Sequence, residues 1–199
     1  MDCSRYMWTM SGYKRERKYL CMTNRHLCEK NLTEKIRELA GNPEIEKIIL
    51  REKDMKAAEY KKLAADCQAI CCRTGKPLVI NHFIQIAREL GVPEIQISYS
   101  QLTETQEELE EFAEVGVSVH DPREARKAED MGASFIIAGH IFPTDCKKGV
   151  PPRGLLYLKE VCRATSLPVY AIGGITPYNI ESVLKAGAKG ACMMSGFMK

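Results

Sequence analysis

The sequence lacks the features that define several classes of protein. No hydrophobic run approaches the roughly 20 residues that a membrane-spanning helix requires. Residues 1–13 contain no apolar core of the signal-peptide type, so no export is expected. The net charge is only +3 and the lysines are scattered, which is unlike a nucleic-acid-binding surface. We therefore expect a cytoplasmic protein that binds neither a membrane nor nucleic acid.

Paired cysteines at metal-binding spacing are missing too. The chain has nine cysteines, an odd number, and its closest group, Cys67, Cys71 and Cys72, contains no pair of Cys-x-x-Cys motifs. Disulfides are not expected without an export signal. We predict that the thiols are reduced and serve mostly as small apolar side chains, with no metal bound.

What the sequence does contain is a repeated alternation of short apolar runs and amphipathic stretches. A chain of 199 residues can bury one sizeable core, so we expect a single domain over 1–199, with 1–16 as a lead-in. The predicted strands are 18–23, 46–51, 77–81, 94–98, 115–120, 133–138, 167–172 and 190–194. The predicted helices are 33–41, 55–74, 83–91, 103–114, 122–132, 154–165 and 177–187. Eight such units predict an α/β protein of the (β/α)₈ TIM-barrel class.

The last helix of this barrel is expected to be missing. The chain stops at Lys199, just after the strand predicted at 190–194, which leaves no sequence for an eighth helix. The apolar stripe that such a helix covers would then need another cover. The segment 6–13, a partner chain such as a second copy in a homodimer, or residues beyond Lys199 are the open alternatives.

One loop combines a titratable base with two cations. The stretch 139–149 reads Gly-His-Ile-Phe-Pro-Thr-Asp-Cys-Lys-Lys-Gly and follows the strand predicted at 133–138. Barrel enzymes carry their reactive groups at the carboxyl ends of the strands, which is where His140 falls. An imidazole exchanges a proton near neutral pH, and Lys147 lies in the same loop. We therefore favour a catalytic over a structural role for His140.

Glycine-rich loops at two neighbouring strand ends form the candidate phosphate site. Gly173 and Gly174 follow the seventh predicted strand and open onto a helix expected to begin at Thr176. Backbone amides without a β-carbon in the way can cradle a phosphate there. The loop that begins at Met194 and Ser195, after the eighth strand, adds a hydroxyl and further amides.

Other strand ends supply weaker candidates. Arg51 and Lys53 can clamp an anion, although such a charge run also suits a solvated loop. A lone histidine is more often structural than catalytic, and this applies to His82. His120 lies next to a helix start, where lining the pocket and satisfying the loop backbone are equally good interpretations.

These motifs resemble those of the thiamine phosphate synthase/TenI superfamily over most of the chain. The similarity lies in Arg-Glu-Lys-Asp at 51–54, Val-Ser-Val-His at 117–120, Phe-Pro-Thr at 142–144, Ala-Ile-Gly-Gly-Ile-Thr-Pro at 171–177 and the segment 186–196. Family members are (β/α)₈ barrels that handle thiazole phosphates in thiamin biosynthesis. Three departures separate the chain from the synthase branch. Ile49 replaces a glutamine, His82 replaces an aspartate, and Ser-Tyr-Ser-Gln at 98–101 replaces the magnesium-binding loop. The carboxylates that hold magnesium against a pyrophosphate leaving group are thus absent.

The stretch 139–149 instead matches the TenI branch, whose pattern is Gly-His-x-Phe-x-Thr-Asp-Cys-Lys-Lys-Gly. The resemblance implies a thiazole tautomerase, an isomerase without a cofactor that aromatises a carboxythiazole phosphate by proton transfer. It implies that His140 is the general acid/base and that Gly173, Gly174, Met194 and Ser195 bind the phosphate. The remaining substrate-binding candidates are Arg51, Lys53, Asn81, His120, Thr144 and Lys147.

Two alternatives to a tautomerase stay open. One is a thiamine phosphate synthase with a rebuilt metal site. The other is a non-catalytic regulatory protein that kept the phosphate pocket, which the uncovered barrel face would suit. Cys146, beside Lys147 in the catalytic loop, also raises the hypothesis of an oxidation-sensitive activity.

Overall fold

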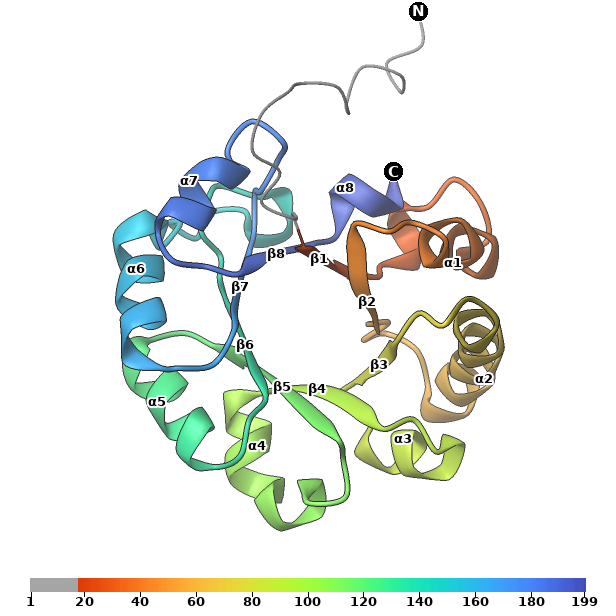
Figure 1. The fold of residues 1–199 in the computed structure, drawn as a ribbon. Coiled ribbons are helices and arrows are strands. Elements are labelled where there is room, and N and C mark those ends of the chain that lie inside the picture. Colours follow the sequence, from red (N-terminus) through yellow and green to blue (C-terminus); the bar gives the residue numbers. More distant parts are fainter. Residues whose placement is uncertain (1–17) are drawn as a thin grey trace, which may run out of the picture.

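A computed structural model describes residues 18–199, in which eight parallel strands close into a barrel surrounded by helices (Figure 1). The strands are β1 (Lys18–Met22), β2 (Ile45–Leu50), β3 (Leu78–Asn81), β4 (Glu94–Ser98), β5 (Glu114–Val119), β6 (Phe135–Gly139), β7 (Val169–Ile172) and β8 (Gly190–Met193). The helices are α1 (Leu32–Ala40), α2 (Ala57–Thr74), α3 (Ile84–Leu90), α4 (Tyr99–Thr105), α5 (Pro122–Asp130), α6 (Gly154–Ala164), α7 (Ile180–Lys185) and α8 (Ser195–Met198). Short 3₁₀ turns are η1 (Arg25–Leu27), η2 (Gln106–Leu109) and η3 (Asp145–Lys147). The predicted (β/α)₈ barrel is confirmed.

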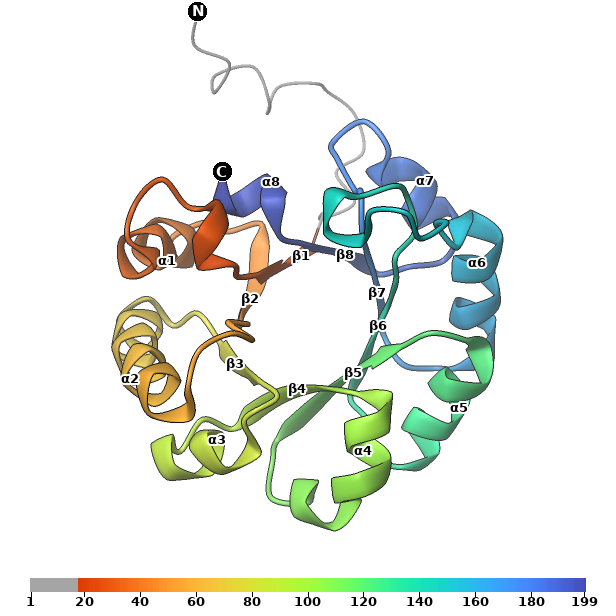
Figure 2. The ribbon, with the colours of Figure 1, turned by 180° about the vertical axis from the view of Figure 1, so that it is seen from behind.

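The prediction that the last helix is missing was wrong. Residues Ser195–Met198 form α8, a single turn directly after β8. Met198 is buried, and the Phe197 ring meets the edge of the Tyr19 ring with centroids 5.7 Å apart. Both views of the fold place α8 next to α1 (Figures 1 and 2). These two apolar side chains pack this turn against the barrel. The other proposed cover, 6–13, and the lead-in 1–16 lie outside the described residues.

One predicted helix, 103–114, begins earlier than expected. The chain turns into α4 at Tyr99, immediately after β4, because the Ser98 hydroxyl accepts the amide N–H of Gln101 at 3.2 Å. The helix ends at Thr105 and continues as η2. Among the described residues, no helix is long and apolar enough to cross a membrane.

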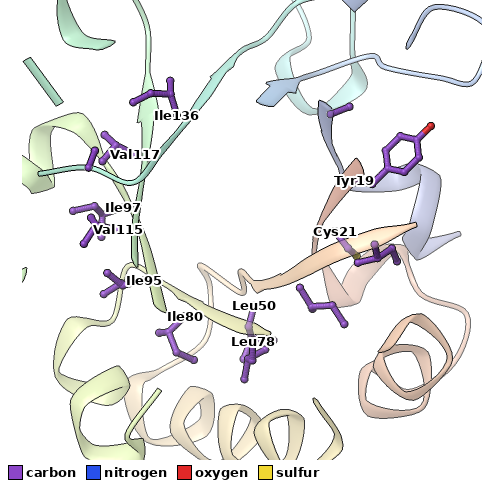
Figure 3. Close-up of a cluster of buried hydrophobic side chains, with 14 of the residues drawn as sticks. Tyr19, Cys21, Leu50, Leu78, Ile80, Ile95, Ile97, Val115, Val117 and Ile136 are labelled. Carbon is purple, nitrogen blue, oxygen red and sulfur yellow. The ribbon is translucent and has the colours of Figure 1, made fainter. Parts of the chain in front are cut away.

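The barrel separates two apolar clusters. Residues on the outer faces of the strands pack against the helices, as Figure 3 shows for Ile80, Ile95 and Val117. The interior cluster comprises Leu20, Met22, Ile49, Val79, Phe135, Ile137, Tyr170 and Cys192. Gly116 makes room for one of these rings, since a β-carbon there would lie 2.2 Å from Cζ of Phe135. The middle of the barrel is therefore a packed apolar plug.

Below this plug, at the amino end of the strands, the interior charges are paired. The Lys47 ammonium lies 2.5 Å from Glu94 Oε2 and 2.8 Å from Glu114 Oε2. Because β2 does not border β4 or β5, this side chain must cross the interior to reach them. Desolvation alone would lower the pKa of Lys47, but the hydrogen bonds to Glu114 and Glu94 outweigh it and leave the pKa raised. Tyr170 adds a hydrogen bond of 2.7 Å to Glu46.

Candidate functional site

His140 follows β6 directly, at the carboxyl end of the barrel. Its side chain is largely buried, and the loop after it folds back over the ring. The Arg153 amide N–H donates to the His140 carbonyl oxygen at 3.0 Å, and Nε2 lies 3.3 Å from the Val150 carbonyl oxygen. A carbonyl only accepts, so Nε2 carries the proton in this contact and the lone pair of the neutral ring is on Nδ1. Nδ1 bonds to nothing among residues 18–199 and can therefore act as a base.

The glycine pair after β7 packs directly against this histidine loop. A β-carbon on Gly173 would lie 2.3 Å from Cβ of His140, and one on Gly174 would lie 2.4 Å from the Pro143 carbonyl oxygen. Both glycines have positive φ, +98° and +64°. The Phe142 amide N–H also donates to the Gly173 carbonyl at 3.0 Å. Close approach to the loop of His140 is a reason for these glycines that the sequence did not reveal.

The helix expected from Thr176 starts later, at Ile180. The side chain of Asn179 occupies the preceding turn, since its Oδ1 accepts the Thr176 amide N–H at 2.8 Å and its Nδ2 donates to the Gly174 carbonyl at 2.9 Å. The glycines therefore do not lie at a helix N-terminus. Any anion held here would be bound by loop amides.

Such loop amides are free at two neighbouring strand ends. Ile172 of β7 pairs with Cys192 of β8, so the residues that follow them lie side by side. Within the described part of the chain, four amide N–H groups at these ends donate to no acceptor, those of Gly173, Gly174, Met194 and Ser195. Unused donors on two adjacent loops suit an anion such as a phosphate.

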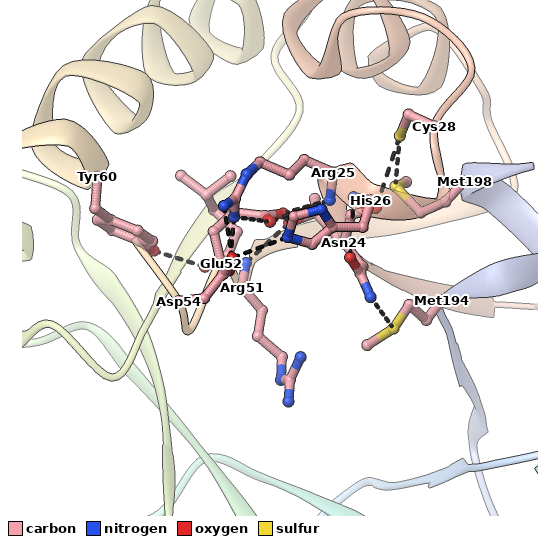
Figure 4. Close-up of polar contacts among 12 residues, drawn as sticks. Asn24, Arg25, His26, Cys28, Arg51, Glu52, Asp54, Tyr60, Met194 and Met198 are labelled. Atoms are coloured by element: carbon pink, nitrogen blue, oxygen red, sulfur yellow. Dashed lines mark hydrogen bonds and ion pairs between the residues drawn. The ribbon is translucent and has the colours of Figure 1, made fainter. Parts of the chain in front are cut away.

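The cationic side chains of Arg51, Lys53 and Lys147 lie near one another at the carboxyl end of the barrel. Arg51 follows β2, and Figure 4 shows its guanidinium extending away from the neighbouring carboxylates toward the side of Met194. It has no hydrogen-bond or ion-pair partner among residues 18–199. Partial burial, followed by the charges of Arg51 and Lys147, lowers the pKa of Lys53. The loops after β2 and β6 thus bring predicted binding residues together.

A polar chain links the inward-facing side chains of the adjacent strands β3, β4 and β5 just above the apolar plug. The Asn81 Nδ2 donates to Gln96 Oε1 at 2.7 Å, and Gln96 Nε2 donates to Ser118 Oγ at 2.8 Å. Asn81 Oδ1 accepts no hydrogen bond from the described residues. Gln96 and Ser118 were missed in the sequence, although polar residues at inward positions of β4 and β5 were a usable signal. This layer forms the floor of the site.

The side chains of two further candidates, His120 and Thr144, form no hydrogen bond or ion pair with His140 among residues 18–199. His120 is exposed, its amide N–H donates to Glu124 Oε2 at 2.6 Å, and its Nδ1 lies 3.6 Å from the same oxygen. Thr144 is half-buried and its carbonyl accepts the Lys147 amide N–H at 3.0 Å. The structure gives neither side chain a contact with the other site residues.

His82 is held in place by α4 rather than turned to the barrel axis. Its Nδ1 lies 2.9 Å from Gln101 Oε1, and Gln101 Nε2 donates to the His82 carbonyl at 2.7 Å. This reciprocal pair supports the structural interpretation made from the sequence. The pair also fixes a backbone with φ of +70°.

The donor set at the ends of β3 and β4 does not fit magnesium. Asn81, His82 and Ser98 offer an amide, an imidazole and a hydroxyl, whereas magnesium prefers carboxylates and water. The nearby Glu52 carboxylate already accepts hydrogen bonds from Thr23 and Arg25. No group of three His, Cys, Asp or Glu side chains suited to a metal occurs within residues 18–199.

A (β/α)₈ barrel with a histidine, free cations and free amides at the carboxyl ends of its strands has the architecture of the barrel enzymes, whose active sites lie at that end. The chain belongs to the thiamine monophosphate synthase (TMP-TENI) family, whose model matches residues 19–197. The resemblance seen in the motifs is thereby confirmed at the level of the family.

Relatives within this family carry the synthase name. The thiamine-phosphate synthase of Listeria welshimeri is 37% identical over 149 residues, which is 72% of this chain and 71% of the relative. A probable thiamine biosynthetic bifunctional enzyme of rice chloroplasts is also 37% identical, and the match spans 73% of this chain but only 28% of that enzyme. These names support an enzyme of thiamine biosynthesis and leave the reaction to be argued from the residues.

Solved structures agree with this placement. Thiamine phosphate pyrophosphorylase from Pyrococcus furiosus is similar with a TM-score of 0.74 and 27% identity, over 90% of this chain and 86% of that one. The tryptophan synthase α-subunit from the same organism matches with a TM-score of 0.65 at 14% identity, over 89% of this chain and 87% of that one. The second likeness concerns the barrel fold alone.

Proposed function

We propose that this protein is a thiazole tautomerase, which aromatises a carboxythiazole phosphate by proton transfer without a cofactor. The observation that carries the proposal is the set of contacts made by the His140 side chain. Its Nε2 faces the Val150 carbonyl, its Nδ1 is free, and its β-carbon lies against the glycine loop whose amides are unused. A base beside an anion-binding loop is what a proton shift on a phosphorylated ring requires.

The proposed reaction moves one proton and changes no oxidation state. Nδ1 of His140 takes a proton from a ring carbon, and the C–H electron pair enters the conjugated system as the ring becomes aromatic. The resulting imidazolium returns a proton to the carbon at the other end of that system. His140 ends neutral, so the step balances within the enzyme and its substrate.

We assign the binding of the substrate's phosphate and carboxylate to two groups of residues at the two ends of the pocket. The free amides of Gly173, Gly174, Met194 and Ser195 would hold the phosphate. Arg51 and Lys53, supported by Lys147, would hold the carboxylate, because a guanidinium and an ammonium without protein partners are ready to bind an anion. Asn81 Oδ1 would face the ring from the floor.

The test follows aromatisation of the thiazole tautomer by ultraviolet absorption. His140→Ala should lower the rate by at least about a hundredfold, the usual contribution of a general acid/base, while inorganic phosphate still binds. His82→Asn is the matched control, because His82 is another histidine at a strand end, its side chain is bonded to Gln101, and asparagine tolerates positive φ. Unchanged turnover in His140→Ala would refute the proposal.

A second candidate is a thiamine phosphate synthase with an altered metal site, and the 37% identical synthase of Listeria welshimeri favours it. Magnesium-dependent formation of thiamine phosphate from a pyrimidine pyrophosphate and a thiazole phosphate would establish it. The missing carboxylates oppose it. The case for a non-catalytic regulatory role depended on an uncovered barrel face. Because α8 covers the place where that face was expected, the case no longer has this support. Ligand binding without turnover in both assays would revive that role.

A further inference from the structure

Two carboxylates lie immediately beside the free cations of the pocket. In the stretch 51–54, Glu52 and Asp54 alternate with Arg51 and Lys53. Pairing within this stretch would occupy both cations and remove them from anion binding. Among the described residues, however, no ion pair joins either carboxylate to Arg51 or Lys53.

Arg25, from the loop after β1, forms ion pairs with both carboxylates instead. Its guanidinium forms two parallel hydrogen bonds to Asp54, Nη1 to Oδ1 at 2.7 Å and Nη2 to Oδ2 at 2.6 Å. Its Nη1 and its amide N–H also reach Glu52 Oε2, at 3.2 and 3.0 Å. Figure 4 shows these contacts on one side of the loop and the Arg51 side chain on the other. Arg25, followed by His26, holds the pKa of Asp54 well below its usual range.

The second oxygen of Glu52 is held by Thr23. The Thr23 hydroxyl donates to Glu52 Oε1 at 2.7 Å and accepts the Arg51 amide N–H at 2.9 Å. The Glu52 side chain is only 1% exposed, so turning toward the pocket would strip a buried carboxylate of its donors. One hydroxyl therefore fixes both the carboxylate and the backbone of the neighbouring cation.

We propose that Arg25 is a positioning residue for the anion site. By taking up Glu52 and Asp54 it keeps these carboxylates away from Arg51 and Lys53, which stay available to an anionic ligand. Arg25 itself is turned away from the pocket and need not touch the ligand. The identity of that ligand as a thiazole carboxylate rests on the proposed function, whereas the positioning role does not.

The test measures binding of oxalate by calorimetry, with no turnover required, because Arg51 and Lys53 are the cations assigned to a carboxylate. Arg25→Gln should weaken binding about tenfold, because the freed carboxylates compete for Arg51. Adding Asp54→Asn to Arg25→Gln removes the competing charge and should restore most of the affinity. A merely structural role would not show this recovery, since the double variant has lost both partners of the contact.

Two further variants complete the set. Arg25→Lys keeps a cation beside the carboxylates and should lose no more than about threefold, which also covers the case in which Arg25→Gln does not fold. Arg25→Gln combined with Arg51→Gln should bind only slightly more weakly than Arg51→Gln alone, because most of the effect of Arg25 acts through the Arg51 guanidinium and only the rest through Lys53.

The proposal fails if Arg25→Gln binds oxalate like the wild type, if Asp54→Asn does not restore binding, or if Arg25→Lys loses tenfold. It also fails if Arg51→Gln has no effect, or if its loss and that of Arg25→Gln are additive. A wild-type protein that gives the expected binding pattern but does not aromatise the thiazole would overturn the proposed function and support the positioning role.

Discussion

The two ends of the barrel interior treat their charges in opposite ways. At the amino end, Lys47 lies between Glu94 and Glu114 and is largely buried. At the carboxyl end, the Arg51 guanidinium has no hydrogen-bond or ion-pair partner among the described residues, and the neighbouring carboxylates are paired with Arg25. The apolar plug between them keeps the two ends separate. Paired charge closes one end and specifies structure, whereas unpaired charge leaves the other end ready for a ligand.

Breaking the pair at the amino end should have the largest effect. Lys47→Met leaves two carboxylates without their cation and should destabilise the protein by about 3 kcal/mol in urea unfolding. Burial, opposed by the bond to Lys47, raises the pKa of Glu94. Without Lys47 that pKa should rise further, so the loss should be smallest at acidic pH and should grow as pH rises through it. Aromatisation per folded molecule should not change; reduced activity would contradict the separation of the ends.

The next largest effect is expected from Gly173→Ala at the carboxyl end. The new β-carbon would lie 2.3 Å from Cβ of His140, and φ of +98° is unfavourable for alanine. Displacing the base by about 1 Å should reduce turnover roughly a hundredfold. Gly132→Ala is the matched control, since Gly132 has φ of +89° but no atom within 4 Å of its β-carbon position. Equal losses in the two variants would show that strain alone, and not the contact with His140, is responsible.

A smaller effect should follow removal of one unpaired cation. Lys147→Gln takes away one of the charges that lower the pKa of Lys53, so that pKa should rise. Oxalate binding should weaken about threefold and depend less on salt, because an exposed charge acts mainly through a screened field. Lys148→Gln, the adjacent exposed lysine, is the control. Identical results for both variants would mean that Lys147 contributes no more to anion binding than the neighbouring Lys148.

The smallest effect should come from the surface ion pair itself. The pKa of Asp54 is lowered by Arg25 and His26, so this carboxylate stabilises the folded state at neutral pH, and its contribution declines progressively as pH falls from about 4 toward the lowered pKa. Asp54→Asn should therefore flatten the acid side of the stability profile, measured by thermal unfolding between pH 3 and pH 7. A steeper acid limb in this variant would contradict the assigned sign.

Much of the fold could be predicted from the sequence because the patterns that specify strands and helices are local. Alternation of apolar runs and amphipathic stretches located every strand to within about two residues, and the helix predicted at 122–132 begins at Pro122 in the structure. The one-turn α8 escaped because four residues carry no helical period. It depends on the burial of Met198 and on Phe197 meeting Tyr19, which are contacts between the two ends of the barrel sequence.

The site residues also divide into those that the sequence could identify and those that only the structure revealed. Strand-end position was enough to nominate His140, Arg51 and Lys53, because parallel strands bring their carboxyl ends to one face. The sequence could not show which cations are free, since Arg25 reaches Glu52 from another strand end. Gln96 likewise became visible only through its contact with Asn81.

The sequence by itself determined the barrel, the family motifs and the face on which chemistry is to be sought, because these depend on periodicity and on residue order along the chain. Only the tertiary structure decided how each charged or polar group is satisfied. It pairs Lys47 across the interior, turns the Val150 carbonyl onto His140, and uses Arg25 to leave Arg51 unpaired. The physical reason is that hydrogen bonds and ion pairs join groups by distance in space, which is unrelated to their separation in the chain.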